Sequence, residues 1–242
     1  DCAAWVRRRP VANPRLLLGA PPGIPFARTA TTASEDRPYA AGALFKKELP
    51  EQLAKIRGER PDKRLLIFHQ DEARFGQQGT LTRVWAPKGS RPPAVKQTEY
   101  EYLWVVGAVC AETGQAEAIL APNLNTDVMN AFLREFSRSL AADVHAVLIW
   151  DGAGFHRSGK LQLPDNVSLI ELPSYSPQLN PIENLWHYLR SHHWSNRWYE
   201  DYDALMEAAI DAWRKVALNP ERVKSVCRAN YLEPYEKRAA ID

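Results

Sequence analysis

Three carboxylates in this 242-residue chain stand where a metal-dependent reaction could use them. Asp71 and Asp151 each follow an apolar run typical of a buried strand, and Glu183 stands near the start of a helical pattern. If the two strands are neighbours, their ends lie about 4.8 Å apart, so the aspartates repel each other unless a cation separates them or one is protonated. Oxygen ligands without cysteine or paired histidine favour Mg²⁺ or Mn²⁺ over zinc.

Each carboxylate also has an ordinary structural interpretation. Aspartate is common in the turns that follow strands. Glu183 comes three residues after Asn180, which is a suitable N-cap, and Pro181 suits the first helical position. Glu183 could therefore reach back to the cap as part of a capping box. The residue preferences of helix N-termini, taken alone, favour that role over metal ligation.

The elements that must position these acids predict a mixed α/β sheet covered by helices. Strands are predicted at 65–70, 82–86, 101–110, 115–121, 145–150 and 167–172, and helices at 44–56, 126–141, 181–193 and 202–216. The third and fourth strands form a hairpin. We expect the strand before Asp151 to pair parallel with the strand before Asp71, so both aspartates would stand at the carboxyl ends of adjacent strands.

Residues 1–43 are predicted to be an irregular, extended arm in front of a catalytic domain at 44–242. They contain six prolines and no sustained helical or alternating pattern, and proline fixes φ and removes a backbone donor. Residues 1–64 carry 13 Lys or Arg and 7 Asp or Glu. This basic leading part could contact a polyanion, although an ordinary solvated tail has the same composition.

Composition excludes several classes of protein. The apolar share of 45% and the charged share of 25% are those of a globular chain, not of a disordered or coiled-coil one. No apolar run reaches the length of about 20 residues that a membrane helix needs. Three scattered cysteines indicate neither a disulfide framework nor a zinc ribbon. We therefore expect no membrane contact and a reducing, cytoplasmic environment.

The acidic segments resemble the motifs of mariner-type DDE transposases, in particular those of the bacterial insertion-sequence branch numbered six-thirty. The segments are Asp71-Glu72 after an apolar strand, Trp150-Asp151-Gly152-Ala153-Gly154-Phe155-His156, and Leu179-Asn180-Pro181-Ile182-Glu183-Asn184-Leu185-Trp186. The resemblance covers residues 44–232 and implies a ribonuclease-H-like fold. It also implies that Asp71, Asp151 and Glu183 are the catalytic triad of a DNA endonuclease and strand transferase.

That family cuts DNA with two divalent ions, Mg²⁺ or Mn²⁺, which lie about 3.5–4 Å apart in such sites. The resemblance implies that Asp71 bridges both ions, while Asp151 and Glu183 each complete one side. It further implies cleavage of double-stranded DNA at transposon ends, strand transfer into a target, and a homodimer in the synaptic complex. The setting it implies is the nucleoid in the bacterial cytoplasm.

Other residues near the expected site are candidates for DNA contacts or for support of the triad. Cations there could bind phosphates, which sets affinity and not sequence choice, and solvated surface is the alternative for each. His156 could contact the scissile phosphate, and Asn184 could orient Glu183, with Asn180 as a further supporting neighbour. The candidate phosphate ligands are Arg74, Arg83, Lys88, Arg157, Lys160 and Arg190.

Two departures from the family pattern leave alternatives open. The spacing of 32 between Asp151 and Glu183 is a few residues shorter than usual, and we expect the loop at 157–166 to absorb the difference. Residues 1–43 do not resemble the helix-turn-helix region that normally precedes the catalytic domain. A catalytically silent DNA-binding relic is therefore one alternative. A generic ribonuclease-H-like nuclease is another, although the motif around Glu183 favours the transposase branch.

Overall fold

The computed structural model describes residues 36–79, 81–90, 92–93, 97–152, 159–173, 176–229 and 231. A five-stranded mixed sheet in the order β3-β2-β1-β4-β5 forms its centre. The strands are β1 (Arg64–Gly76), β2 (Tyr102–Val109), β3 (Ala116–Ala121), β4 (Val144–Trp150) and β5 (Val167–Glu171). The helices are α1 (Asp36–Glu59), α2 (Thr126–Ser139), α3 (Ile182–Leu189), α4 (Tyr202–Ala217) and α5 (Pro220–Val226).

The central strand, β1, changes its partner along its length. Its first half, residues 64–69, pairs parallel with β4, as predicted. Its second half, residues 69–76, pairs antiparallel with β2, and β2 forms the predicted hairpin with β3. β5 adds a further parallel strand beside β4. β1 therefore joins a parallel and an antiparallel part of one sheet.

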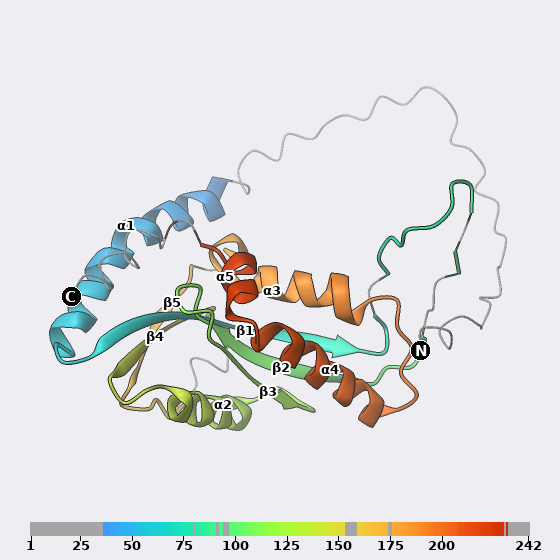
Figure 1. The fold of residues 1–242 in the computed structure, drawn as a ribbon. Helices are drawn as coiled ribbons and strands as arrows, with labels where there is room; N and C mark the ends of the chain where they lie inside the picture. Colours follow the sequence, from blue (N-terminus) through green and yellow to red (C-terminus); the bar gives the residue numbers. More distant parts are fainter. Residues whose placement is uncertain are drawn as a thin grey trace.

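Helices cover both faces of this sheet (Figure 1). Successive side chains of a strand point to opposite faces, so alternate residues of β1 enter different cores. Leu66 and Phe68 pack with α2 on one face, and Ala73 and Phe75 pack with α3 and α4 on the other. On that second face a third apolar cluster joins α1 to β4 and β5. The sheet is thus held between layers of helices, and its central strand also carries polar residues, among them the buried His69 and Gln70.

Two of the predicted strands differ from the structure. β1 does not end before Asp71 but continues through it to Gly76, because β2 supplies hydrogen-bonding partners for this polar half. The strand predicted at 82–86 does not form. Its alternating pattern fits a strand, but the segment joins no sheet among the described residues, and Trp85 is fully exposed.

The helices also differ in their bounds. α1 begins at Asp36, eight residues before the predicted start, so it crosses the boundary placed at 43/44; residues 1–35 of the expected arm lie outside the described residues. The helix predicted at 181–193 is α3 followed by a π-helical turn, η3 (Arg190–Trp194). α5 was not predicted. Asn219 and Pro220, which end α4 as expected, also begin α5, because the Asn219 side chain accepts from the backbone of Arg222.

In the part of the chain that the structure describes, no helix combines the length and the apolar character needed to span a membrane.

Candidate active site

Asp71 and Asp151 belong to two neighbouring parallel strands, Asp71 within β1 and Asp151 directly after β4. The parallel pairing of β1 with β4 ends at His69 and Ile149. Two residues farther along each strand, the same register places Asp71 opposite Asp151. Asp71 lies within β1 and is partly buried, whereas Asp151 follows the last residue of β4 and is exposed. The predicted meeting of the two aspartates at one edge of the sheet therefore agrees with the topology.

Asp71 is held in a strongly perturbed environment. The indole Nε1 of Trp186, from α3, donates a hydrogen bond of 2.9 Å to its Oδ2. Burial, followed by the negative charges of Glu183 and Glu72, raises the pKa of Asp71 to about 7, while the hydrogen bonds from the Glu72 backbone and Trp186 act in the opposite direction. A carboxyl with such a raised pKa is stabilised when it binds a proton or a cation.

Glu183 reaches this carboxyl from the first turn of α3. A single 3₁₀ turn, η2 (Pro177–Leu179), and the residues Asn180 and Pro181 lead into the helix. Glu183 is partly buried, and its charge is the largest electrostatic cause of the raised Asp71 pKa. The start of α3 therefore brings a second acid to Asp71, although the two residues are more than a hundred positions apart in the sequence.

The expected capping role of Asn180 is wrong. Its side-chain Nδ2 donates instead to the backbone carbonyl of Gln70, at 3.0 Å, and the helix takes Pro181 as its N-cap with no side-chain cap hydrogen bond. Asn180 thus attaches the turn before α3 to β1, one residue before Asp71. Its Oδ1 is buried and has no hydrogen-bond partner among the described residues.

The chemistry of these donors fits a hard divalent cation. Carboxylates are the ligands that Mg²⁺ and Mn²⁺ prefer, and burial, followed by the charges of Glu183 and Glu72, raises the pKa of Asp71. Within the described residues, however, no three His, Cys, Asp or Glu side chains are gathered closely enough to hold a metal ion as they stand. Mutual repulsion of carboxylates is a sufficient physical reason for side chains of protein alone to remain apart.

The predicted DNA-contacting cations are placed unevenly around this site. Arg190 comes two helical turns after Glu183, and with Arg74 it lines a pocket of about 50 Å³. The Arg74 guanidinium lies over the ring of Tyr102, 5.1 Å from its centroid. Neither arginine forms an ion pair within the described part of the chain.

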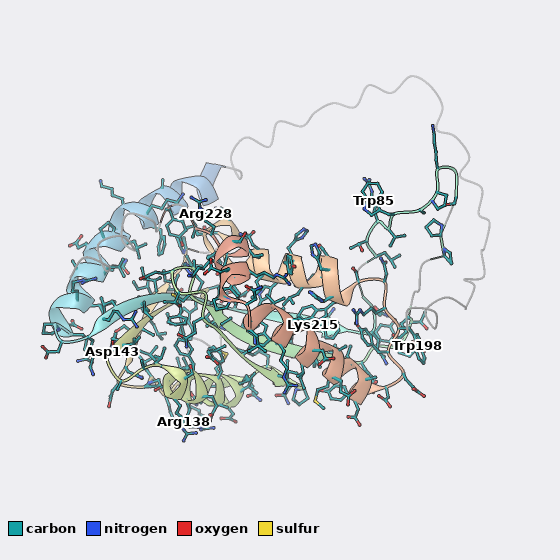
Figure 2. The ribbon with its side chains drawn as sticks, in the orientation of Figure 1. Trp85, Arg138, Asp143, Trp198, Lys215 and Arg228 are labelled. Atoms are coloured by element: carbon teal, nitrogen blue, oxygen red, sulfur yellow. The ribbon has the colours of Figure 1, made fainter. Side chains whose placement is uncertain are left out.

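The remaining candidates are exposed or lie outside the described residues. Arg83 and Lys88 are exposed on the segment that projects from the sheet beside Trp85, which Figure 2 labels. Lys160 is exposed, and its carbonyl accepts from Asn130 of α2 at 3.1 Å. Asn184 is exposed, without a hydrogen bond to Glu183. His156 and Arg157 lie outside the described residues.

Two amide side chains hold the projecting segment, and sequence reasoning missed both. Asn196 takes a left-handed φ of 56° and makes two bonds to the backbone of Thr82, one donated by Thr82 N to Oδ1 (3.1 Å) and one from Nδ2 to Thr82 O (3.0 Å). The buried Gln97 does the same with Tyr199, accepting from its backbone N at 2.9 Å and donating to its carbonyl. We refer to these two pairs as the amide clamps.

Trp186 of α3 combines a place in the core with a contact to the site. It is fully buried, but its indole N–H also reaches Asp71. Its position three residues after Glu183, on the same side of a helix, was the available signal. Trp194 packs in the core, stacked on Phe75 at 4.5 Å, while Trp198 is 57% exposed and is labelled in Figure 2.

The sequence matches one family model. Residues 66–206 match the model described as DDE superfamily endonuclease. This range contains Asp71, Asp151 and Glu183, and it covers more than half of the chain.

Curated relatives include bacterial and animal proteins. An uncharacterized protein of Sinorhizobium fredii is 39% identical over 125 residues, which are 52% of this chain and 93% of the relative. An uncharacterized 39 kDa protein of insertion element IS630 from Shigella sonnei is 24% identical over 54% of this chain and 41% of its own length. The transposase of transposable element Tc3 from Caenorhabditis elegans is 38% identical over 64 residues, 26% of this chain and 19% of its own length.

Solved structures show the same fold. The mariner Mos1 paired end complex with Mg aligns with a TM-score of 0.57 and 14% identity, covering 93% of this chain and 66% of that one. The catalytic domain of Mos1 mariner transposase aligns with a TM-score of 0.51 and 15% identity, covering 85% and 93%. The ribonuclease-H-like mixed sheet predicted from the sequence is therefore confirmed.

Proposed function

Since the chain belongs to the DDE superfamily of endonucleases, in its mariner- and IS630-type transposase branch, and has the catalytic function of a transposase, we propose that Asp71, Asp151 and Glu183 are its catalytic triad and metal ligands. The support for this assignment is the position of the two aspartates on adjacent strands, together with the effect of the Glu183 charge on the pKa of Asp71. That effect is the single observation that carries the proposal.

The residues around the triad have separable tasks in this scheme. Two divalent ions, Mg²⁺ or Mn²⁺, would activate the attacking water or 3′-hydroxyl and stabilise the leaving oxygen. Asp71, Asp151 and Glu183 would supply the carboxylate ligands of these ions, and Asp71, whose pKa responds to the charge of Glu183, would be the shared one. Trp186 fixes one oxygen of Asp71, and Asn180 fixes the backbone beside it.

The proposed substrate is double-stranded DNA at the ends of a transposon. In the first step an oxygen of water bonds to phosphorus and the P–O3′ bond breaks, which leaves a 3′-hydroxyl and a 5′-phosphate. In the second step the oxygen of that 3′-hydroxyl bonds to a phosphorus of the target and loses its proton, while the P–O3′ bond of the target breaks and its 3′-oxygen takes up a proton to leave as a hydroxyl. Basic residues would hold the DNA backbone during both steps; they are Arg74, Arg83, Lys88, Arg157, Lys160 and Arg190, with His156 near the scissile phosphate.

Synapsis of two ends requires two active sites, so we propose that the protein works as a homodimer on paired ends. The solved neighbours titled as paired end complexes favour this arrangement. The bacterial relatives favour action on nucleoid DNA in the cytoplasm of a bacterial cell.

A nicking assay tests the assignment. A short DNA duplex is incubated with the protein and Mg²⁺ or Mn²⁺, and the wild type is compared with Glu183→Gln and with Glu207→Gln, an exposed acid of α4. We expect metal-dependent nicking by the wild type and by Glu207→Gln, and none by Glu183→Gln. Nicking that survives in Glu183→Gln would refute the role of Glu183. A wild type that neither nicks DNA nor binds Mn²⁺ would support a catalytically silent relic.

A further inference from the structure

Tyr231, in the segment after α5, reaches back to the turn that precedes α3. Its phenolic hydroxyl donates a hydrogen bond of 2.7 Å to the backbone carbonyl of Leu179. The same oxygen lies 2.9 Å from Nε2 of His69 on β1. Its ring packs against the apolar cluster that joins α1 to the sheet, and the ammonium of Lys46 lies over it at 5.5 Å.

The direction of these hydrogen bonds follows from counting protons. A phenol carries one hydrogen, and Tyr231 gives it to Leu179. The contact with His69 must then be donated by the imidazole, so Nε2 of His69 carries the proton. The three groups thus form one directed chain, from His69 through Tyr231 to Leu179.

The residues at the two ends of this hydrogen-bonded chain are near the proposed catalytic carboxylates in sequence. His69 is near Asp71 on β1, and Leu179 is near Glu183 at the start of α3. Leu179 is followed by Asn180, whose side chain is bonded to the carbonyl of Gln70. Two consecutive residues of the turn are therefore attached to two consecutive residues of β1, His69 through Tyr231 and Gln70 directly. The attachments lie immediately before Asp71 on one element and within four residues of Glu183 on the other.

Leu179 itself is buried, so its carbonyl has little access to water if the phenol is removed. A buried carbonyl without a donor is costly, and the turn would move to find one. Because η2 contains only three residues and leads through Pro181 into the helix, such a movement is passed on to the start of α3.

We propose that Tyr231 is a positioning residue for the Glu183 carboxylate: it holds the turn before α3 against β1 and so sets the distance between Glu183 and Asp71. The match to the family model ends at residue 206, so this assigns a part of the active site to chain beyond the matched range. The metal-binding consequence of this inference rests on the function proposed above. The structural consequence, an ordered turn at 176–184, does not.

The test compares Tyr231→Phe with Tyr199→Phe. Tyr199 is a matched control because its ring also packs in an apolar core, yet its buried hydroxyl has no hydrogen-bond partner among the described residues. Hydrogen exchange of the peptide that covers 176–184 is measured first. Titration of the protein with Mn²⁺ alone follows, and then nicking at saturating DNA.

We expect Tyr231→Phe to exchange about tenfold faster in this peptide and to bind Mn²⁺ about tenfold more weakly, the size of one buried hydrogen bond. The kcat at a fixed, sub-saturating Mn²⁺ concentration is expected to fall while KM for DNA stays unchanged. Tyr199→Phe is expected to match the wild type in all three measurements.

Several outcomes would overturn the proposal. The first is that the exchange rate and the Mn²⁺ affinity of Tyr231→Phe both stay within twofold of the wild type. Faster exchange over the whole sheet, with a large fall in Tm, is another, since it would indicate a general structural role. A wild type that binds no Mn²⁺ would refute the proposed function instead, and the exchange result would still decide whether Tyr231 holds the turn.

Discussion

The two halves of β1 differ in what surrounds them. Residues 64–69 lie beside β4, and Leu66 and Phe68 are buried among apolar neighbours. Residues 70–76 have β2 as their partner and carry Asp71, with the cation Arg74 three residues later. The first half is covered on both faces and contributes stability. The second half keeps acids and cations near the surface, where a substrate can reach them, at a cost in electrostatic repulsion.

One strand therefore combines a closely packed apolar half with a half that carries mutually repelling charges. The buried apolar side chains of the first half are close-packed in the core, and this packing fixes the position of the strand. The repulsion among Asp71, Glu183 and Glu72 is then sustained by that support. Substitutions of the buried apolar residues should change stability most, and those of the polar residues in the second half should change function with small or opposite effects on stability.

The largest effect is expected from Phe68→Ala in the apolar half. Phe68 is fully buried and packs edge-on against Phe136 of α2, with ring centroids 4.9 Å apart. The loss of apolar contact and the cavity left behind should lower the free energy of unfolding by about 3–5 kcal/mol. Denaturant unfolding measures this value. A loss below about 1 kcal/mol would contradict the assignment of this half as the stabilising one.

A smaller effect of opposite sign is expected from Asp71→Asn in the polar half. The folded protein holds the Asp71 proton with a pKa of about 7, against an ordinary value of 3.8. In the wild type the stabilisation from this proton is complete below pH 4 and is lost as the pH rises through about 7. Without metal, Asp71→Asn should therefore be more stable than the wild type at pH 8, by about 1–3 kcal/mol, and similar at pH 4.

Unfolding free energies measured at pH 4, 6 and 8 without divalent ions test that expectation. In the presence of metal, Asp71→Asn should not nick DNA at any pH. Asp151→Ala provides a companion variant, since we expect it to abolish cleavage and to fold normally. A wild type that is stabilised by rising pH relative to Asp71→Asn would contradict the environment assigned to Asp71.

Trp186→Phe separates the support of Asp71 from its charge. The change keeps most of the buried ring and removes the N–H that donates to Asp71 Oδ2. Because that hydrogen bond lowers the pKa of Asp71, its loss should raise the pKa further and weaken Mn²⁺ binding about tenfold. Stability should fall by about 1 kcal/mol. Mn²⁺ affinity equal to that of the wild type would show that the indole serves packing alone.

The smallest effect on stability is expected from Arg74→Ala. Its side chain is exposed and lies over Tyr102, so the free energy of unfolding should change by less than about 0.5–1 kcal/mol. If Arg74 binds a phosphate, the salt dependence of DNA affinity should become shallower, by about one unit in the slope of log K against log salt. An unchanged slope would remove Arg74 from the DNA-contacting residues.

Much of the fold was predictable because its strands and helices have clear periods. The apolar runs before Asp71 and Asp151, the hairpin and α2 all follow from local patterns, and the parallel pairing follows from the intervening helix. The segment 82–86 has the local pattern of a strand, but it finds no pairing partner among the described residues and does not form one. A partner is a property of the whole fold, which a local pattern does not contain.

The site was predictable only where a residue type was itself informative. Three acids at strand and helix ends, read with the family motifs, indicated the proposed triad. The hydrogen bonds of Asn180 to β1, of Trp186 to Asp71 and of Tyr231 to Leu179 join residues far apart in sequence, and no spacing rule indicates them. From the sequence alone, Asn180 has the pattern of an ordinary helix cap and Trp186 that of an ordinary core residue.

The amide clamps have a consequence for how this protein can change. Asn196 and Gln97 fix Thr82 and Tyr199 by side chain–backbone bonds, and none of these bonds uses a side chain from the residues between 83 and 96. The closure of this excursion therefore does not depend on its content, and loop entropy rises only slowly with length. Insertions and replacements between the clamps can be accepted, so new surface can evolve there, or be grafted there, without disturbing the sheet that carries the proposed catalytic acids.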